Sequence, residues 1–365
     1  MAGGARGYLP RDLLQAHSSQ SIYSFRGADP GLFYRLAKLN NATIYELPIN
    51  YRSSGNIIKA AAAVDRGPLA KKVKAVRPEG SVPRIIPTKD LQTEAEDIAE
   101  IVKEIGDPEN TAVLVRCRFQ APPILSALRD AGIPYNTPNE LCIENQPEVR
   151  QLLSFAGALD AESKDAENVL RIWLRDLSYA ERKAILSRAK NNPAGIYGVV
   201  RDWRFSGLAK ALPRGLGAFL EEVVKRFNMI EYWTSADPEE GESRAENIRT
   251  VVDLAKGIKG RPLDALSELK KTLSGSDDTG VRVSTIHGTK GLEWRHVVIA
   301  GFSGGLLPYE SSKHKVDEEE ERRLAYVAIT RAADTLVMTS PRFAGDRPLG
   351  LCPYIADIRG IAGVR

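Results

Sequence analysis

Residues 281–300 read VRVSTIHGTKGLEWRHVVIA, and this stretch decides the class of fold. Two apolar runs, Val281–Thr285 and His296–Ala300, are typical of buried strands. Between them lies the polar loop Thr285–Trp294, which contains two glycines. Strands that are joined by long connections rather than by tight hairpins indicate a parallel sheet covered by helices.

The next stretch along the chain, Glu318–Ala332 (EEEERRLAYVAITRA), predicts an amphipathic helix followed by a strand at Thr335–Thr339. Spacings of three and four place Leu324, Val327, Ala328 and Arg331 on one face of that helix. The i,i+4 pairs Glu318–Arg322 and Glu319–Arg323 are expected to be solvated and worth only ~0.2–0.5 kcal/mol each.

Arg331 is the unusual member of this apolar face. Burying a guanidinium is costly unless an anion meets it. Two interpretations remain open from the residues alone: an ion pair with an internal carboxylate, or a contact with a phosphate group.

The first third of the chain shows the same alternation of strands and helices. The expected strands are Thr43–Leu47, Val82–Pro87 and Thr111–Val115, and the expected helices are Asn56–Ala63, Glu94–Ile105 and Pro122–Ala131. From about Pro147 the strand signal stops, and the pattern becomes helical. The helices expected there are Glu148–Leu159, Ala166–Leu174, Ala180–Ala189, Leu216–Phe227, Ala245–Lys256 and Leu263–Leu273. The sequence therefore predicts one α/β domain that is interrupted by a helical insertion.

Two further segments are of a type that carries chemistry. Gln20–Ala28 reads QSIYSFRGA, and Asn50–Ser53 reads NYRS. Phe25 beside Arg26 suits single-stranded nucleic acid, because bases stack on aromatic rings while the cation meets phosphate. The plain alternative is a core Phe next to a surface Arg. The chain has no Gly-Lys dipeptide and therefore no Walker A loop.

Taken together and in order, these four segments resemble motifs III, IV, V and VI of the UvrD/Rep-type superfamily 1 DNA helicases. The R-x-E-N sequence at Arg244–Asn247 is similar to the end of the helical 2B insertion of that family. The resemblance runs from Gln20 to about Ser340. It implies a RecA-like P-loop NTPase 2A motor domain with a small 2B insertion. The implied division is 1–28 (a remnant ending in motif III), 29–146 and 274–345 (2A), 147–273 (2B-like) and 346–365 (a C-terminal tail).

The resemblance also implies roles for individual residues. In the family, ATP lies between the 1A and 2A domains. By motif position, Gln20 would sense the γ-phosphate, Tyr51 would stack on the adenine, Arg52 and Arg331 would reach the γ-phosphate, Glu293 would hold the ribose, and Gly291 would belong to the nucleotide-binding loop. Phe25, Arg26, Thr285, His287 and Lys290 would lie on the DNA side.

Several motifs and residues that are typical of the family are not found in this sequence. Motifs Q, I, Ia and II are not found in the sequence, so the groups that hold ATP and Mg²⁺ would come mainly from a separate 1A half. Ala16 and His17 stand where the family usually has Gly-Asp. Arg175–Glu181 lacks the glycines of the element that grips duplex DNA in the family.

The expected function is therefore the C-terminal motor half of an ATP-dependent 3′–5′ DNA helicase of repair or replication. It would move along single-stranded DNA with a 1A partner and would be inactive alone. The alternative is a helicase remnant that binds nucleic acid or protein without catalysis.

Composition agrees with either function. The 365 residues are 43% hydrophobic and 27% charged with a net charge of +4, which permits a nucleic-acid partner without requiring one. No secretory signal or membrane span is expected. Cys117, Cys142 and Cys352 form no C-x-x-C pair, so we expect a cytoplasmic protein with no metal site.

Overall fold

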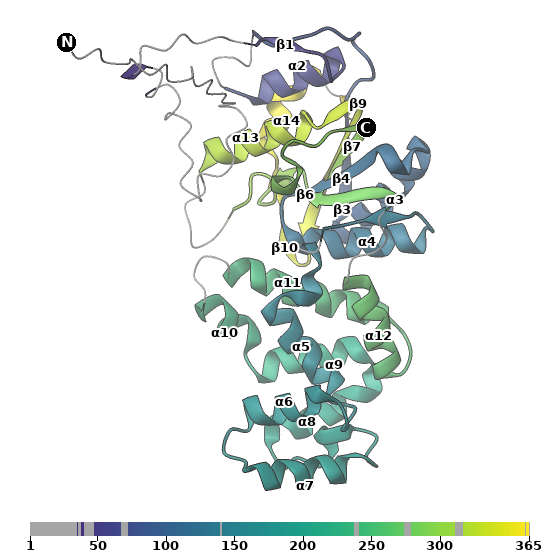
Figure 1. The fold of residues 1–365 in the computed structure, drawn as a ribbon, viewed down its shortest axis with the longest axis vertical. Helices are drawn as coiled ribbons and strands as arrows, with labels where there is room; N and C mark the ends of the chain where they lie inside the picture. Colours follow the sequence, from purple (N-terminus) through teal and green to yellow (C-terminus); the bar gives the residue numbers. More distant parts are fainter. Residues whose placement is uncertain are drawn as a thin grey trace, which may run out of the picture.

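The structure is a computed structural model that describes residues 35, 38–39, 47–66, 72–138, 141–236, 241–273, 279–310, 317–361 and 363–364. An α/β unit occupies one end of its long axis, and a bundle of helices occupies the other (Figure 1). Gln20, Phe25, Arg26 and most of the strand expected at Thr43–Leu47 lie outside the described residues.

The α/β unit contains an eight-stranded sheet within the described residues. Seven strands run parallel in the order β12-β3-β9-β7-β4-β6-β5, and β10 pairs with β9 in the antiparallel sense. Their bounds are β3 Arg84–Asp90, β4 Thr111–Val115, β5 Tyr135–Asn136, β6 Val281–Thr285, β7 Trp294–Ile299, β9 Ala332–Ala344, β10 Arg347–Pro348 and β12 Gly363–Val364. The prediction of a parallel α/β fold is confirmed. β7 and β9 begin earlier than expected and β3 begins later, while β9 also continues well beyond Thr339.

Helices cover both faces of this sheet, which explains why its strands are nearly continuous apolar runs. Successive residues of a strand point to opposite faces. Accordingly, Ala112 and Leu114 pack in one cluster, while Val113 and Val115 pack in another. The first cluster contains residues of α2 (Gly55–Val64), α13 (Glu318–Ile329) and α14 (Pro353–Ile358); the second contains residues of α3 (Leu91–Ile105) and α4 (Ala121–Asp130).

The insertion leaves the sheet after β5 and returns at β6. These two strands are neighbours, and Val281 N donates to Pro134 O at 2.9 Å where the two ends of the insertion meet. Its helices are α5 Pro147–Gly157, α6 Lys164–Trp173, α7 Tyr179–Ala189, α8 Trp203–Ala211, α9 Leu216–Arg226, α10 Met229–Ala236, α11 Gly241–Gly257 and α12 Pro262–Leu273. They enclose a core of their own. The six expected helices are present with shifted ends. Two helices were not predicted: α8, which contains Gly207, and α10, which is short and rich in aromatic and β-branched residues.

Residues 346–365, expected to be a tail, contribute to the core of the α/β unit through α14 and β12. The expectation that the Glu318–Arg322 pair is solvated was wrong for Arg322, which is only 3% exposed and contacts α14. Its guanidinium donates to Asp357 Oδ2 at 2.7 Å and to the Val64 carbonyl at 3.0 Å, and it lies 4.8 Å from the Tyr354 ring centre. The contact with Glu318 is longer, at 3.7 Å. Among the described residues, no helix is long and apolar enough to cross a membrane.

Candidate functional site

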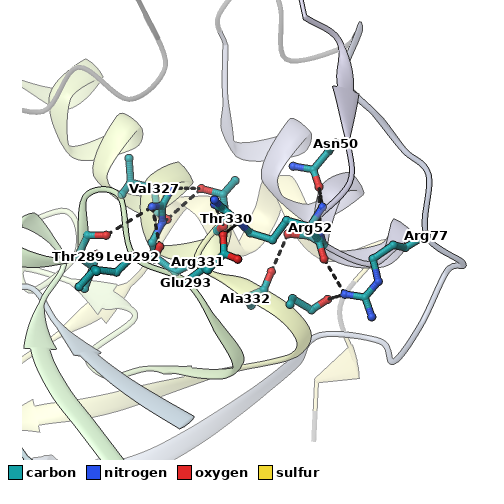
Figure 2. Close-up of polar contacts among 12 residues, drawn as sticks. Asn50, Arg52, Arg77, Thr289, Leu292, Glu293, Val327, Thr330, Arg331 and Ala332 are labelled. Carbon is teal, nitrogen blue, oxygen red and sulfur yellow. Dashed lines mark hydrogen bonds and ion pairs between the residues drawn. The ribbon is translucent and has the colours of Figure 1, made fainter. Parts of the chain in front are cut away.

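Three segments that are distant in sequence meet at the amino ends of β7 and β9, which we call the amino edge (Figure 2). Glu293 directly precedes β7, and Arg331 directly precedes β9. Arg52 comes from the connection between β1 (Ile49–Asn50) and α2. The Trp294 amide donates to the Arg331 carbonyl at 3.0 Å, which keeps the starts of the two strands side by side.

The Arg52 segment is held in place by its own side chains and by β9. Asn50 Oδ1 accepts from the amides of Arg52 (3.0 Å) and Ser53 (2.9 Å), which closes a tight turn. Ser53 Oγ donates to the Ala332 carbonyl at 2.6 Å, and the Ser54 amide donates to the Ala333 carbonyl at 2.9 Å. The NYRS segment is therefore attached to the strand that Arg331 precedes.

The Arg52 guanidinium points toward the other two site residues. Its Nε forms an ion pair with Glu293 Oε2, and its Nη1 donates to the Thr330 carbonyl at 3.4 Å. The side chains of Arg52 and Glu293 are 33% and 57% exposed, so both remain accessible from solvent.

Arg331 is held quite differently, because its side chain is buried at 2% exposure. Nε donates to the Val327 carbonyl at 3.0 Å, and Nη1 donates to the carbonyls of Leu292 (2.9 Å) and Thr289 (3.4 Å). Nη2 donates to Thr330 Oγ1 at 3.4 Å. Of the two interpretations left open by the sequence, the ion pair with an internal carboxylate is not formed among the described residues; backbone carbonyls take its place. Arg331 also lies beyond the end of α13 rather than on its apolar face.

The charges at the amino edge favour an anion. Burial, and after it the nearby positive charge of Arg52, lowers the pKa of Arg331 to about 10. Arg331 therefore stays protonated at neutral pH. Two guanidiniums with one carboxylate leave a net positive charge, which attracts anionic ligands.

Tyr51 and Gly291 flank this charged cluster. Tyr51 is 71% exposed beside Arg52, so its ring is accessible for stacking. Gly291 has φ +87°, a left-handed conformation that glycine adopts without strain. Glu293 follows it by two residues, so this turn aims the chain into β7.

Of the residues assigned to the DNA side, Thr285, His287 and Lys290 lie in the described part of the chain, at the end of β6 and in the loop that follows it. Thr285 ends β6 at the opposite, carboxyl edge of the sheet, and its Oγ1 accepts from the Gly288 amide at 3.1 Å. The loop 286–293, which carries His287 and Lys290, then crosses from the carboxyl end of β6 to the amino end of β7; both strands flank β4. One short connection therefore joins the two groups of predicted residues.

One residue that contacts the site, Arg77, was not predicted from the sequence. Arg77 donates through Nη1 to the Arg52 carbonyl at 2.6 Å and to the Ala333 carbonyl at 3.2 Å (Figure 2). It follows β2 (Lys74–Ala75) in a segment with no recognisable motif, so nothing in the sequence marked it.

These features define a class of protein, namely parallel α/β domains that are interrupted by a helical insertion and carry an arginine pair at the amino edge of the sheet. The chain belongs to the UvrD-like helicase C-terminal domain family, whose sequence pattern matches residues 45–197 and 210–342. This confirms the resemblance drawn from the motifs.

Curated relatives carry helicase names. The chain is 27% identical to the ATP-dependent DNA helicase Rep of Buchnera aphidicola, covering 89% of this chain and 58% of that one. It is 27% identical to the ATP-dependent DNA helicase PcrA of Staphylococcus epidermidis (88% and 50% covered) and 26% identical to DNA helicase II of Salmonella typhimurium (90% and 51%). The chain therefore spans about half the length of these relatives. A solved C-terminal domain of a possible DNA helicase from Lactobacillus plantarum overlaps with 86% of this chain and 98% of that one, at 10% identity and a TM-score of 0.36.

Proposed function

We propose that this chain is the C-terminal motor half of an ATP-dependent 3′–5′ DNA helicase of repair or replication, acting in the cytoplasm. Residues 29–146 and 274–345 would form its RecA-like 2A domain, completed by 346–365, and 147–273 its 2B-like insertion. The observation that carries the proposal is the convergence of Arg52, Glu293 and Arg331 at one edge of the sheet. The relatives that share this region are named as ATP-dependent DNA helicases.

The residues at the amino edge fit a nucleotide that is shared with a second domain. Two guanidiniums suit phosphate oxygens, the exposed Tyr51 ring suits a base, and Glu293 suits ribose hydroxyls. The described residues contain no group of His, Cys, Asp and Glu side chains arranged to hold a metal ion. Because motifs Q, I, Ia and II are not in the sequence, Mg²⁺ and the β-phosphate would be held mainly by the 1A half, and Gln20 of the motif III segment would sense the γ-phosphate.

In this proposal the chain contributes charge stabilisation to the reaction. As water attacks the γ-phosphorus and the bond to the bridging oxygen breaks, negative charge redistributes over the phosphate oxygens. Arg52 and Arg331 would stabilise that charge, and an arginine in this role is worth about 10³–10⁵ in rate. Arg331 is 2% exposed, and four hydrogen bonds already engage most of its five N–H groups. We propose that it exchanges part of these carbonyl contacts when it reaches a phosphate.

The loop 286–293 offers a route from nucleotide to DNA. Thr289 and Leu292 of this loop accept hydrogen bonds from Arg331, while the same loop carries His287 and Lys290. When Arg331 changes partners, the loop loses two of its attachments. We propose that this exchange links ATP hydrolysis to movement on single-stranded DNA, with Thr285, Phe25 and Arg26 also on the DNA side.

The experiment is reconstitution with a 1A domain that carries a G-x-x-x-x-G-K-[ST] loop, followed by phosphate release with and without single-stranded DNA. We expect no turnover from the chain alone and DNA-stimulated turnover from the mixture. Arg52→Ala should lower that turnover by about 10³-fold or more. Arg261→Ala is the matched control, because it breaks an exposed ion pair with Asp264 on the insertion.

The alternative function, a non-enzymatic helicase remnant, predicts a different result. A non-enzymatic remnant would bind single-stranded DNA or protein without supporting turnover in any mixture. Binding that persists while the reconstituted mixture stays inactive would therefore favour the remnant over the motor half.

A further inference from the structure

Arg77 connects the two arginine-bearing segments of the amino edge. A single nitrogen, Nη1, donates to the carbonyl of Arg52 itself (2.6 Å) and to the carbonyl of Ala333, two residues after Arg331 (3.2 Å). Its Nη2 donates to Asp334 Oδ1 at 2.5 Å. The guanidinium therefore touches the backbone of both segments at once.

The segment that carries Arg77 is held by backbone hydrogen bonds on both sides of this residue. β2 pairs with β1 in the parallel sense, next to the Arg52 turn. Beyond Arg77, the carbonyls of Pro78 and Glu79 accept from the amides of Gly55 (2.8 Å) and Asn56 (2.9 Å) at the start of α2. The Arg52 turn thus lies between this segment on one side and β9 on the other, and Arg77 spans both.

Asp334 fixes the outer end of the Arg77 guanidinium. Its second oxygen, Oδ2, accepts from Arg295 Nε at 2.8 Å, so one carboxylate serves two arginines. Arg295 is 59% exposed, and among the described residues it contacts Asp334 and Asp107 rather than the Arg52 or Ala333 carbonyl. Partly exposed ion pairs contribute little to stability by themselves. The bridge between the two carbonyls is what distinguishes Arg77 from Arg295.

We propose that Arg77 is a positioning residue that fixes Arg52 relative to the Arg331 segment. This rests on the proposed function, since it assigns Arg77 a part in the same reaction. Arg77 does not touch the nucleotide. It holds the Arg52 backbone so that the guanidinium, which extends from it toward Glu293, keeps one placement. A displacement of about 1 Å of such a group can cost about 10²-fold in rate.

The test compares Arg77→Ala with Arg295→Ala, because both remove one partner of Asp334 and only the first removes the bridge. In the reconstituted mixture, Arg77→Ala should lower kcat by about 10- to 100-fold with little change in KM for ATP. Arg295→Ala should keep kcat within about twofold. Arg77→Lys should resemble Arg77→Ala, because an ammonium on a shorter reach cannot reproduce the planar donor fork. Equal kcat for the two alanine variants would overturn the proposal.

A second measurement needs neither ATP nor a 1A partner. In the chain alone, hydrogen exchange of the Ser54 amide, which donates to Ala333, should become about tenfold faster in Arg77→Ala and stay unchanged in Arg295→Ala. The Val113 amide in β4, a strand paired on both sides, serves as the internal reference. If wild-type mixtures show no turnover, the proposed function fails, but this exchange experiment still decides the bridge. Unchanged Ser54 exchange in Arg77→Ala would overturn it.

Discussion

Arg331 Nη1 donates a hydrogen bond of 2.9 Å to the carbonyl oxygen of Leu292. Arg331 precedes β9, whereas Leu292 belongs to the loop that joins β6 to β7. The bond therefore ties the start of one strand to the connection that leads into its neighbour. Arg331, the most buried arginine of the site, therefore stabilises the fold and is also the proposed phosphate contact.

We expect Arg331→Ala to lower the free energy of unfolding by about 1–3 kcal/mol, because the carbonyls of Val327, Thr289 and Leu292 lose their donor. Urea denaturation measures this. Arg295→Ala, at an exposed position, should leave the urea midpoint nearly unchanged. An unchanged midpoint for Arg331→Ala would mean that these bonds contribute nothing. Since stability falls whether or not Arg331 meets phosphate, its role in turnover has to be assayed where the variant is fully folded.

Glu94 on α3 predicts a pH dependence of stability. It is 1% exposed, and its Oε1 accepts from the Gly301 amide at 2.7 Å and from Thr339 Oγ1 at 2.5 Å. Burial raises the pKa of this carboxyl from 4.5 to about 8. Between these values the folded state binds the proton and the unfolded state does not. Stability contributed by Glu94 is therefore complete below about pH 4.5 and is lost as the pH rises toward 8.

The measurement is urea denaturation of wild type and Glu94→Gln from pH 5 to pH 8. The amide keeps an oxygen for both hydrogen bonds and removes the ionisation, so the stability of the variant relative to wild type should increase with pH. Glu100→Gln on the same helix is the control, because Glu100 is exposed. Curves for Glu94→Gln and wild type that run parallel over this range would show that Glu94 does not titrate as expected.

Gly280 and Gly291 form a matched pair for a backbone test. Their φ values are +92° and +87°, but a Cβ at Gly280 would lie 2.2 Å from the Pro134 carbonyl oxygen, whereas one at Gly291 would meet nothing within 4 Å. Gly291→Ala should cost about 1–2 kcal/mol, the left-handed penalty alone. Gly280→Ala should cost clearly more, because Pro134 would have to move where the insertion rejoins the sheet. If urea denaturation gave the same loss of unfolding free energy for both variants, the predicted clash with Pro134 would be wrong.

The proposed DNA side predicts salt-dependent binding. The chain should bind fluorescent single-stranded DNA weakly, and the affinity should fall steeply as salt rises, because phosphate contacts release counterions. Phe25→Ala should weaken binding by about 1–3 kcal/mol if a base stacks on the ring. Trp203→Ala is the control, an exposed aromatic on the insertion. Equal affinity of wild type and Phe25→Ala at low salt would remove Phe25 from the DNA site.

Local sequence patterns were sufficient for the elements whose environment is uniform. β4 is buried at all five positions, so its unbroken apolar run predicted it correctly from Thr111 to Val115. Helix α3 was predicted because its apolar residues repeat at helical spacing. The pattern failed where packing overrides it. α14 is only six residues long, yet Tyr354 and Ile358 are buried because α13 and α2 cover them.

The sequence by itself determined the family, the parallel α/β class and the identity of Arg52, Glu293 and Arg331 as site candidates, because motifs record residue types that chemistry requires. Only the tertiary structure decided how these side chains are held. Arg331 is caged by backbone carbonyls rather than by a carboxylate, and carbonyls belong to every residue, so no pattern of side chains announces them. Arg77 reaches Arg52 through the same kind of contact. The register of the strands decides which backbone oxygen lies near which guanidinium. That register is set by tertiary packing, and residue spacing along the chain does not reveal it.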